Sequence, residues 1–392
     1  MKMENILFLF TLFLSISYAA FISWCIFGWM RSAKFQATPS SYLSKVFVSV
    51  IIPARNEAEN ISACLSDFLH QDYSRDLFEL IVADDHSEDN SADIVERFIR
   101  ENPSLRIRLL KMHEREKTNL FKKHAITEAI SISSGELIIT TDADCRRGPE
   151  WLGTLAQYYR QFKPEMMSAP VIFSNEKSWF EKIQSLEFLG LIAIGAAAIN
   201  NKKPFLCNGA NLAFTKTAFI EAGGYTSAKN ISSGDDTLLM QKIAGMNKEG
   251  RAASRGKEAI HFVKSAEAMV TTRAQHSLQA LLNQRKRWAS KIPVQMSAFT
   301  IFIAVIAYLL HAGLLLSGIL MFYTGNILFF LVPLIIKMVP EFVLLSGVSS
   351  FFKKTSLLFL FLPAQIIYPV YISIVGLASM TGEYQWKGRK AK

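Results

Sequence analysis

A charge-free apolar stretch at residues 6–30 constrains this 392-residue chain more than any other feature of its sequence. A run of this length can cross a bilayer as a single helix. Cleavable signal peptides have shorter apolar cores, so cleavage near Ala19 and Ala20 is the alternative. Arg31 and Lys34 follow at once, and the positive-inside rule therefore predicts that the helix ends in the cytoplasm.

Apolar segments return at about residues 297–323, 327–352 and 357–380, and each is long enough to span a bilayer. Three spans after the first would leave the basic C-terminal tail outside the cell, against the positive-inside rule. Either one late segment is therefore re-entrant or interfacial, or the tail breaks the rule. The sequence leaves the side of the tail open.

Two charged residues interrupt the second late segment. Lys337 and Glu341 lie at i and i+4, where opposite charges meet on one face of a helix. Because charges inside a membrane are costly, we expect this pair to interact within the helix, with a polar path as the alternative.

Another apolar stretch, residues 179–199, carries charged and polar residues in its first half. We interpret it as an amphipathic helix on the membrane surface, near the place where a lipid-linked or growing acceptor would lie.

The chain has a net charge of +10, from 43 basic and 33 acidic residues. Much of the excess lies beside the apolar segments, which fits a protein that faces anionic lipid. Between those segments acidic and basic residues are mixed, so no nucleic-acid surface is predicted. The four cysteines lack metal-ligand spacing and are interpreted as reduced, cytoplasmic thiols.

The middle of the chain alternates β-branched runs with helical patterns. Strands are predicted at residues 46–52, 77–82 and 105–110 and again from Glu136, and helices at about 58–70, 91–100 and 123–131. This alternation predicts an α/β fold with a doubly wound sheet. Glycines are too sparse for a Walker or dinucleotide-binding loop.

The sequence contains three notable pairs of acidic residues. Two pairs follow predicted strands, and the third precedes a later helical pattern. The fourth strand ends in Asp142-Ala143-Asp144, and ligands of open α/β sheets gather at the carboxyl ends of strands. Clustered carboxylates there can bind a hard cation, although Asp residues that start a turn are the simpler interpretation. Asp84 and Asp85 end the second strand, and Asp235 and Asp236 come before the helical pattern, where an acidic N-cap is the alternative.

Taken in order, these motifs resemble glycosyltransferase family 2, in its membrane-integrated branch of cellulose, hyaluronan and poly-N-acetylglucosamine synthases and ceramide glucosyltransferase. The resemblance rests on residues 50–57, 83–87, 121–125, 142–144, 232–239 and 284–288, and it covers about residues 48–291. It implies a GT-A fold, a nucleotide-diphospho-sugar transferase domain, flanked by transmembrane helices. His86 and Phe121 stand where the family has glycine.

The resemblance implies a site for a nucleotide diphosphate sugar donor. The expected donor-binding residues are Pro53, Ala54, Arg55, Glu57, Asp85, Lys122, Asp142 and Arg287. Asp85 is expected to hydrogen-bond a pyrimidine base, and Lys122 and Arg287 to neutralise the diphosphate, with a solvated basic turn as the alternative for Lys122. Asp144 and Asp142 are expected to hold Mg²⁺ or Mn²⁺, which stabilises the leaving diphosphate as a Lewis acid.

On the acceptor side, the resemblance assigns catalysis to Asp236 and Asp235. Asp236 is the expected general base, because inverting transfer needs a base opposite the leaving group. The expected acceptor contacts are Gln284, Trp288, Asn208 and Asn211. Trp288 is expected to stack on a sugar ring of the acceptor. The alternative interpretation of the whole Gln-x-x-Arg-Trp motif is a basic amphipathic stretch beside a membrane.

The sequence thus predicts an inverting glycosyltransferase of the inner (plasma) membrane, with a nucleotide diphosphate sugar donor and a lipid or glycan acceptor. Residues 1–36 would form a transmembrane helix and linker, 37–296 a cytosolic GT-A domain, and 297–392 a membrane domain of two to three spans with a basic tail. Its acceptor would be a lipid or lipid-linked sugar at the cytoplasmic face, with a processive polysaccharide synthase as the alternative. A non-catalytic scaffold would be expected to have lost some of these acids, and an anchored nucleotidyltransferase would not need Asp236 or Trp288.

Overall fold

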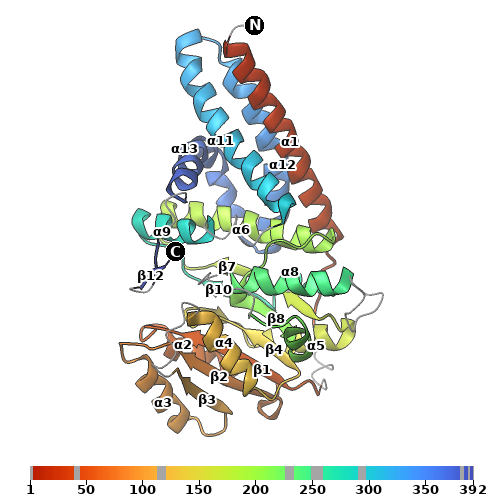
Figure 1. Ribbon diagram of the computed structural model, residues 1–392, viewed down its shortest axis with the longest axis vertical. Coiled ribbons are helices and arrows are strands. Elements are labelled where there is room, and N and C mark those ends of the chain that lie inside the picture. The colour runs from red at the N-terminus through yellow and green to blue at the C-terminus, as the bar shows by residue number, and fades with distance from the viewer. Residues whose placement is uncertain are drawn as a thin grey trace.

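The computed structural model describes residues 3–38, 45–112, 121–225, 234–248, 259–289, 297–379, 384–386 and 389–391. It has an α/β domain at one end of its long axis and a bundle of long apolar helices at the other (Figure 1). The domain boundaries expected at residues 36 and 296 stay predictions.

The α/β domain is built on a seven-stranded sheet in the order β3-β2-β1-β4-β8-β6-β9. Its strands are β1 (Val48–Ala54), β2 (Phe78–Asp84), β3 (Ile107–Lys111), β4 (Leu137–Thr140), β6 (Met166–Ser168), β8 (Leu212–Thr215) and β9 (Ile260–Phe262). The first four strands are parallel, as predicted, and nearly every residue of β1 and β2 is buried, as expected for strands covered on both faces. Beyond β4 the sheet is mixed, because β8 runs antiparallel to both β4 and β6.

A second, three-stranded sheet joins β5 (Arg146–Arg147), β10 (Val270–Thr272) and β7 (Val171–Phe173). The helices of the α/β domain are α2 (Ile61–Ser66), α3 (Ser91–Glu101), α4 (Phe121–Ser131), α5 (Trp151–Phe162), α7 (Lys216–Glu221) and α8 (Asp235–Lys248), and short 3-10 turns lie at η2 (Asp67–His70), η3 (Arg75–Leu77) and η4 (Gly209–Asn211).

The helical stretch predicted at residues 58–70 is present from residue 61, as α2 followed directly by a 3-10 turn that ends at His70. In that turn the Asp67 carboxylate accepts hydrogen bonds from the Arg146 guanidinium and from the backbone N–H of Arg147. The turn is therefore tied to β5 rather than continued as helix.

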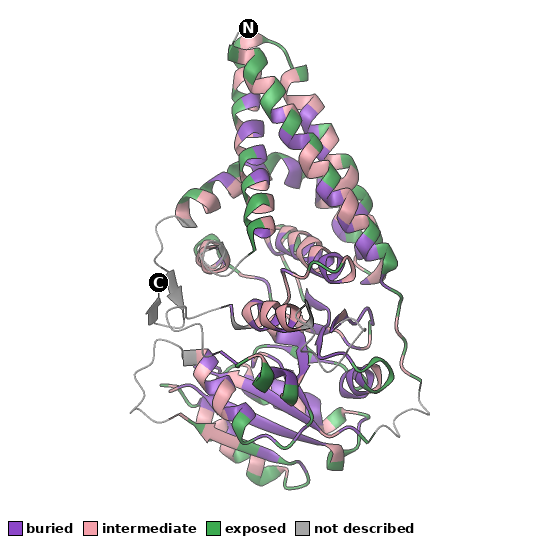
Figure 2. Ribbon diagram, turned by 45° about the vertical axis from the view of Figure 1, so that its right-hand side comes forward, coloured by how far each residue is buried: buried purple, intermediate pink, exposed green. Residues whose placement is uncertain are grey.

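Three long apolar helices run together away from the α/β domain: α1 (Met3–Arg31), α11 (Ala298–Thr324) and α12 (Leu328–Phe351). Their outer faces are exposed (Figure 2) and carry large apolar side chains such as Phe13, Phe322 and Val343. Exposed apolar faces of this extent suit a lipid environment. Among the described residues, five helices are long and apolar enough to cross a membrane: these three, α6 and residues 355–378.

The last apolar segment differs from the other three. It begins with a 3-10 turn, η5 (Thr355–Leu360), and continues as α13 (Phe361–Ser379), which runs crosswise to the bundle (Figures 1 and 2). The chain then returns to the side of the α/β domain, where the hairpin of β11 (Tyr384–Trp386) and β12 (Arg389–Ala391) lies beside α9 (Leu278–Ala289).

The pairing predicted between Lys337 and Glu341 is confirmed, with Lys337 Nζ 2.8 Å from Glu341 Oε2. The pair belongs to a larger cluster, because Tyr18 of α1 donates to Glu341 at 2.7 Å and Lys337 donates to Gln365 of α13 at 2.6 Å. These contacts satisfy buried charges and join three helices inside the apolar part of the molecule.

Helix α6 (Trp179–Asn200) lies across the foot of the helix bundle, between it and the sheets (Figure 1). Two polar residues of its first half, Glu181 and Gln184, are buried and bonded to His276 and to the backbone of Gln275, and the position expected for this helix on the membrane surface stays a prediction. At its other end, Gly28 of α1 packs so closely on α6 that an added Cβ would lie 2.6 Å from a backbone oxygen.

Candidate active site

A cleft of about 110 Å³ opens at the carboxyl ends of β1, β2 and β4. It is lined by Pro53, Ala54, Arg55, Glu57, Asp85, Lys122, Asp142, Ala143, Asp144 and Arg287. All eight residues predicted to bind the donor are therefore in its lining. We refer to it as the donor cleft.

The turn after β2 supports one wall of the donor cleft. The Asp85 backbone N–H donates to Ala54 O at 2.8 Å, and the buried Arg55 guanidinium donates to the carbonyls of Asp85 and His86 at 2.8 and 2.6 Å. His86 has φ +57°, so it adopts the left-handed conformation that a glycine would take with less strain. Its imidazole lies 3.0 Å from Asp85 Oδ1, and the departure from the family pattern therefore leaves this turn intact.

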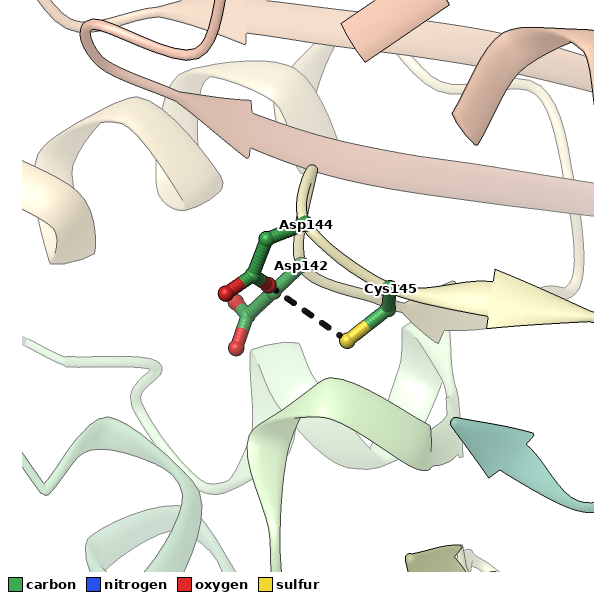
Figure 3. A group of neighbouring side chains, drawn as sticks. All are labelled: Asp142, Asp144 and Cys145. Carbon is green, nitrogen blue, oxygen red and sulfur yellow. Dashed lines mark hydrogen bonds between the residues drawn. The ribbon is translucent and has the colours of Figure 1, made fainter. Parts of the chain in front are cut away.

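Two carboxylates at the end of β4 form the candidate metal site. Ligand atoms of Asp142, Asp144 and Cys145 lie within 4.8 Å of one another, with the carboxylates side by side (Figure 3). Burial and the two neighbouring carboxylates raise the pKa of Cys145 well above its ordinary value, which favours the thiol form. Its Sγ donates to Asp144 at 3.5 Å. The carboxylate oxygens suit Mg²⁺ or Mn²⁺, and a neutral thiol does not.

Lys122 faces the same carboxylates, with Nζ 2.7 Å from Asp142 Oδ1. The neighbouring Lys123 is only 1% exposed and is absent from the described lining of the cleft. Of these two lysines in the first turn of α4, Lys122 is therefore the one that reaches the donor cleft.

A second cavity, of about 330 Å³, lies between α6, α9, the start of α8 and α13. Its walls are largely apolar and include Phe188, Leu191, Ile192, Leu206, Phe262 and Val375. Asp236, Trp288 and Asn208 also line it, as the sequence predicted for an acceptor site. We refer to it as the acceptor cavity.

Backbone N–H groups hold the Asp236 carboxylate at the start of α8. Gly209 N donates to Oδ2 at 3.1 Å and Thr237 N donates to Oδ1 at 2.8 Å. Gly209 is joined in turn to the end of β4, because Thr140 Oγ1 donates to its carbonyl at 2.9 Å. The pairing of β4 with β8 thus brings Asp236 close to the strand that leads to the donor carboxylates, while the side chain of Asp235 lies outside the described part of the structure.

Helix α9 contributes side chains to both cavities. Its Arg287 lines the donor cleft and the next residue, Trp288, lines the acceptor cavity. Consecutive residues of an α-helix point about 100° apart, so one helix can serve both cavities. The Trp288 ring stacks on Phe188 of α6, with centroids 6.1 Å apart.

Two of the predicted acceptor contacts, Asn211 and Gln284, are absent from the described lining of the acceptor cavity. Asn211 is fully buried, donates to Pro170 O and Ala268 O, and accepts from Trp151 Nε1, so the acceptor contact predicted for it is wrong. Its amide holds three segments together instead. Gln284 is absent from the described lining of both cavities and accepts a hydrogen bond from Arg285.

Sequence reasoning missed Glu187 and Arg285, which line the acceptor cavity and bond to each other at 2.8 Å. The signal for Glu187 was its position as the last charged residue before the uninterrupted apolar half of residues 179–199. Arg285 occupies one of the two variable positions of the Gln-x-x-Arg-Trp motif, to which no role was assigned. Neither signal indicates that the two residues bond to each other, because they are 98 positions apart in the sequence.

Two family models match the chain, "Glycosyl transferase family 2" at residues 49–220 and "Glycosyl transferase family group 2" at residues 137–372. A segment is 36% identical over 108 residues to a dolichyl-phosphate beta-glucosyltransferase of Dictyostelium discoideum, covering 26% of this chain and 32% of the relative. Another is 29% identical over 154 residues to an undecaprenyl-phosphate 4-deoxy-4-formamido-L-arabinose transferase of Edwardsiella ictaluri, covering 39% and 45%. The matched segments thus span less than half of either relative.

Among solved structures, the chain resembles a mannosyltransferase from Pyrobaculum calidifontis in complex with GDP-Man and Mn²⁺, with a TM-score of 0.53 over 92% of this chain and 99% of the other. At 18% identity this likeness concerns the fold, which is the GT-A fold predicted. The second family model covers more than half of the chain, which therefore belongs to glycosyl transferase family group 2, and the resemblance to glycosyltransferase family 2 is confirmed.

Proposed function

We propose that the chain transfers a sugar, with inversion, from a nucleotide diphosphate sugar to a lipid or lipid-linked acceptor at the cytoplasmic face of the membrane. The observation that carries the proposal is the pair of cavities to which α9 contributes side chains, one with paired carboxylates and one largely apolar. The names of the two relatives, which refer to dolichyl and undecaprenyl phosphate, support a lipid-linked acceptor.

On the donor side, Asp144 and Asp142 would hold a divalent cation. The cation, when bound, supplies Lewis-acid stabilisation of the charge on the leaving diphosphate. Lys122 and Arg287, which both line the cleft, contribute positive charge, and Asp85 accepts a hydrogen bond from the base. The Mn²⁺ bound to the mannosyltransferase of similar fold supports a divalent cation.

On the acceptor side, Asp236 would act as the general base. Its carboxylate takes the proton of the acceptor hydroxyl while the oxygen attacks the anomeric carbon and the bond to the diphosphate breaks. The two backbone N–H groups on Asp236 orient it for this role. Because base and leaving group lie on opposite sides of the sugar, the configuration inverts.

The arrangement of the apolar helices supports a topology with three spans, α1, α11 and α12. With α13 as an interfacial helix, Arg31 and the β11–β12 hairpin, which carries Arg389 and Lys390, lie on the same side as the α/β domain, in agreement with the positive-inside rule. Three spans therefore avoid the conflict with the positive-inside rule that four spans would create.

The test is to incubate membranes that contain the full chain with labelled sugar nucleotides, with and without Mn²⁺. Label in the lipid extract, dependent on the cation, is the expected result. Label in polymer would instead support the processive alternative, and hydrolysis of the donor without transfer would contradict both.

A further inference from the structure

The acceptor cavity contains a buried cation whose hydrogen bonds are made within the protein. This cation is the guanidinium of Arg285, which is 5% exposed. Its Nη2 donates to Glu187 Oε2 at 2.8 Å, and its Nε donates to the Tyr371 hydroxyl at 3.0 Å. Its Nη1 donates to Gln284 Oε1 at 2.8 Å. The guanidinium also lies over the Trp288 ring, 4.2 Å from its centroid. It therefore joins α9 to α6 and α13.

This cation is balanced by an acid of the same cavity. Burial lowers the pKa of Arg285, but Glu187 and Tyr371 raise it by more, so the guanidinium stays charged. Among the described residues that line the cavity, the charged ones are Glu187, Asp236 and Arg285. The described lining therefore has two carboxylates for one cation.

Such a lining is unfavourable for a lipid phosphate. A phosphate monoester carries about −1.5 to −2 charges at neutral pH, and an apolar cavity stabilises such a charge only with cations that are not already paired. A neutral hydroxyl avoids this cost. It also needs a base to remove its proton, whereas a phosphate oxygen is already ionised.

We propose that Glu187 makes the acceptor cavity selective for lipids or lipid-linked sugars whose reacting end is an uncharged hydroxyl, and against lipid phosphates. The inference rests on the proposed function and narrows its acceptor class. Val375 of α13 lines the cavity, so a lipid tail can leave it toward the apolar helices while the hydroxyl lies near Asp236. The cavity would thus differ in preference from enzymes that glycosylate a polyprenyl phosphate.

The chemistry of the product tests the inference without any variant. Membranes containing the full chain are given labelled sugar nucleotide, and the labelled lipid is heated in mild acid. A glycosyl phosphate releases its labelled monosaccharide, whereas a sugar added to a hydroxyl is retained on the lipid or is released only as part of a larger glycan.

Absence of free labelled monosaccharide is the expected result. Its release as the main product overturns the inference and the base role of Asp236, while leaving sugar transfer to a lipid acceptor standing. No label in any lipid overturns the proposed function, and the inference with it.

A pair of matched variants tests the role of Glu187. Purified enzyme in vesicles is given two probes, undecaprenyl phosphate and a monoglucosyl diacylglycerol, and the ratio of the two initial rates is measured for each variant. Because both rates come from the same preparation, partial loss of folded enzyme cancels in the ratio.

Glu187→Gln, which removes the acid that balances Arg285, is expected to shift the ratio toward the phosphate probe by about tenfold. Glu181→Gln makes the same change on the same helix, outside the cavity, and is expected to leave the ratio unchanged. Equal ratios for Glu187→Gln and the wild type, or a wild type that prefers undecaprenyl phosphate, overturn the inference. Should Glu187→Gln be wholly inactive, the acid-treatment result decides.

Discussion

Arg287 and Trp288 are consecutive residues of α9, yet the first lines the donor cleft and the second lines the acceptor cavity. The two cavities thus share one helix, which Arg285 fixes to α6 through Glu187 and to α13 through Tyr371. A shift of α9 would therefore move both walls together.

Substitutions at these two residues should separate donor from acceptor kinetics. Arg287→Gln is expected to raise the donor KM by about tenfold or more, because one charged contact to the diphosphate is lost, and to leave the acceptor KM nearly unchanged. Trp288→Ala should reduce transfer to acceptor more than donor hydrolysis, because a stacking surface is lost. Steady-state kinetics with each substrate varied in turn provides the measurement, and identical effects of both variants on both substrates would contradict the division.

The donor cleft was predictable because its residues follow strands with strong local patterns. The apolar run before Asp142 marks β4, and Asp85 and Arg55 follow equally clear strands, so their meeting at one edge of a parallel sheet follows from topology. The acceptor cavity was predictable only in part. Asp236 and Trp288 stood in motifs, whereas the walls from α6 and α13 depend on how distant apolar helices pack, which composition does not encode.

The wrong prediction for Asn211 has a physical origin. A polar residue before an apolar strand looks the same in sequence whether it faces a ligand or, like Asn211, satisfies buried carbonyls. Likewise, the sequence does not show that Glu181 and Gln184 are bonded within the protein, because their partners His276 and Gln275 lie on a segment about ninety residues away.

The turn after β2 gives a test of backbone conformation. His86 has φ +57°, where a side chain with a Cβ costs about 1 kcal/mol more than glycine. His86→Gly is therefore expected to be more stable than His86→Ala by about 1 kcal/mol, since both lose the contact with Asp85 and only glycine relieves the strain. Thermal unfolding of the two variants in detergent compares them, and equal stability would show that the turn has relaxed.

Lys264 predicts a pH-dependent contribution to stability. Its Nζ donates to Trp29 O at 2.8 Å, and burial together with Lys34 lowers its pKa to about 8. Between that value and an unfolded pKa of about 10.4, the unfolded chain binds more protons, so this residue makes stability rise with pH. Below pH 8 both states are protonated and the cost of burying the charge is present in full.

Lys264→Met should therefore flatten the stability profile between about pH 8 and 10 relative to wild type. The exposed Lys182, changed to Met, serves as the control and should keep the slope. Midpoints of thermal unfolding across this range give the comparison, and a slope unchanged in Lys264→Met would refute the assignment.

The carboxylates at the end of β4 lead to a prediction on metal dependence. Asp144→Asn is expected to weaken activation by Mn²⁺ by more than about tenfold, because a charged oxygen ligand is lost. Cys145→Ala, next to it, should leave the Mn²⁺ dependence unchanged, since this ion prefers carboxylate oxygen to sulfur ligands. Donor turnover measured against Mn²⁺ concentration tests both, and a normal Mn²⁺ profile in Asp144→Asn would remove the metal assignment.

The base role of Asp236 can be separated from donor binding. Asp236→Asn keeps a side chain of similar size at the start of α8 but cannot accept the acceptor proton, so transfer is expected to fall by about 10²- to 10⁴-fold. Donor affinity should stay within about twofold, because Asp236 lies in the acceptor cavity and is absent from the described lining of the donor cleft. Binding of a labelled sugar nucleotide and initial rates of transfer are measured on the same preparation. A variant that binds donor and still glycosylates lipid at the wild-type rate would exclude Asp236 as the base.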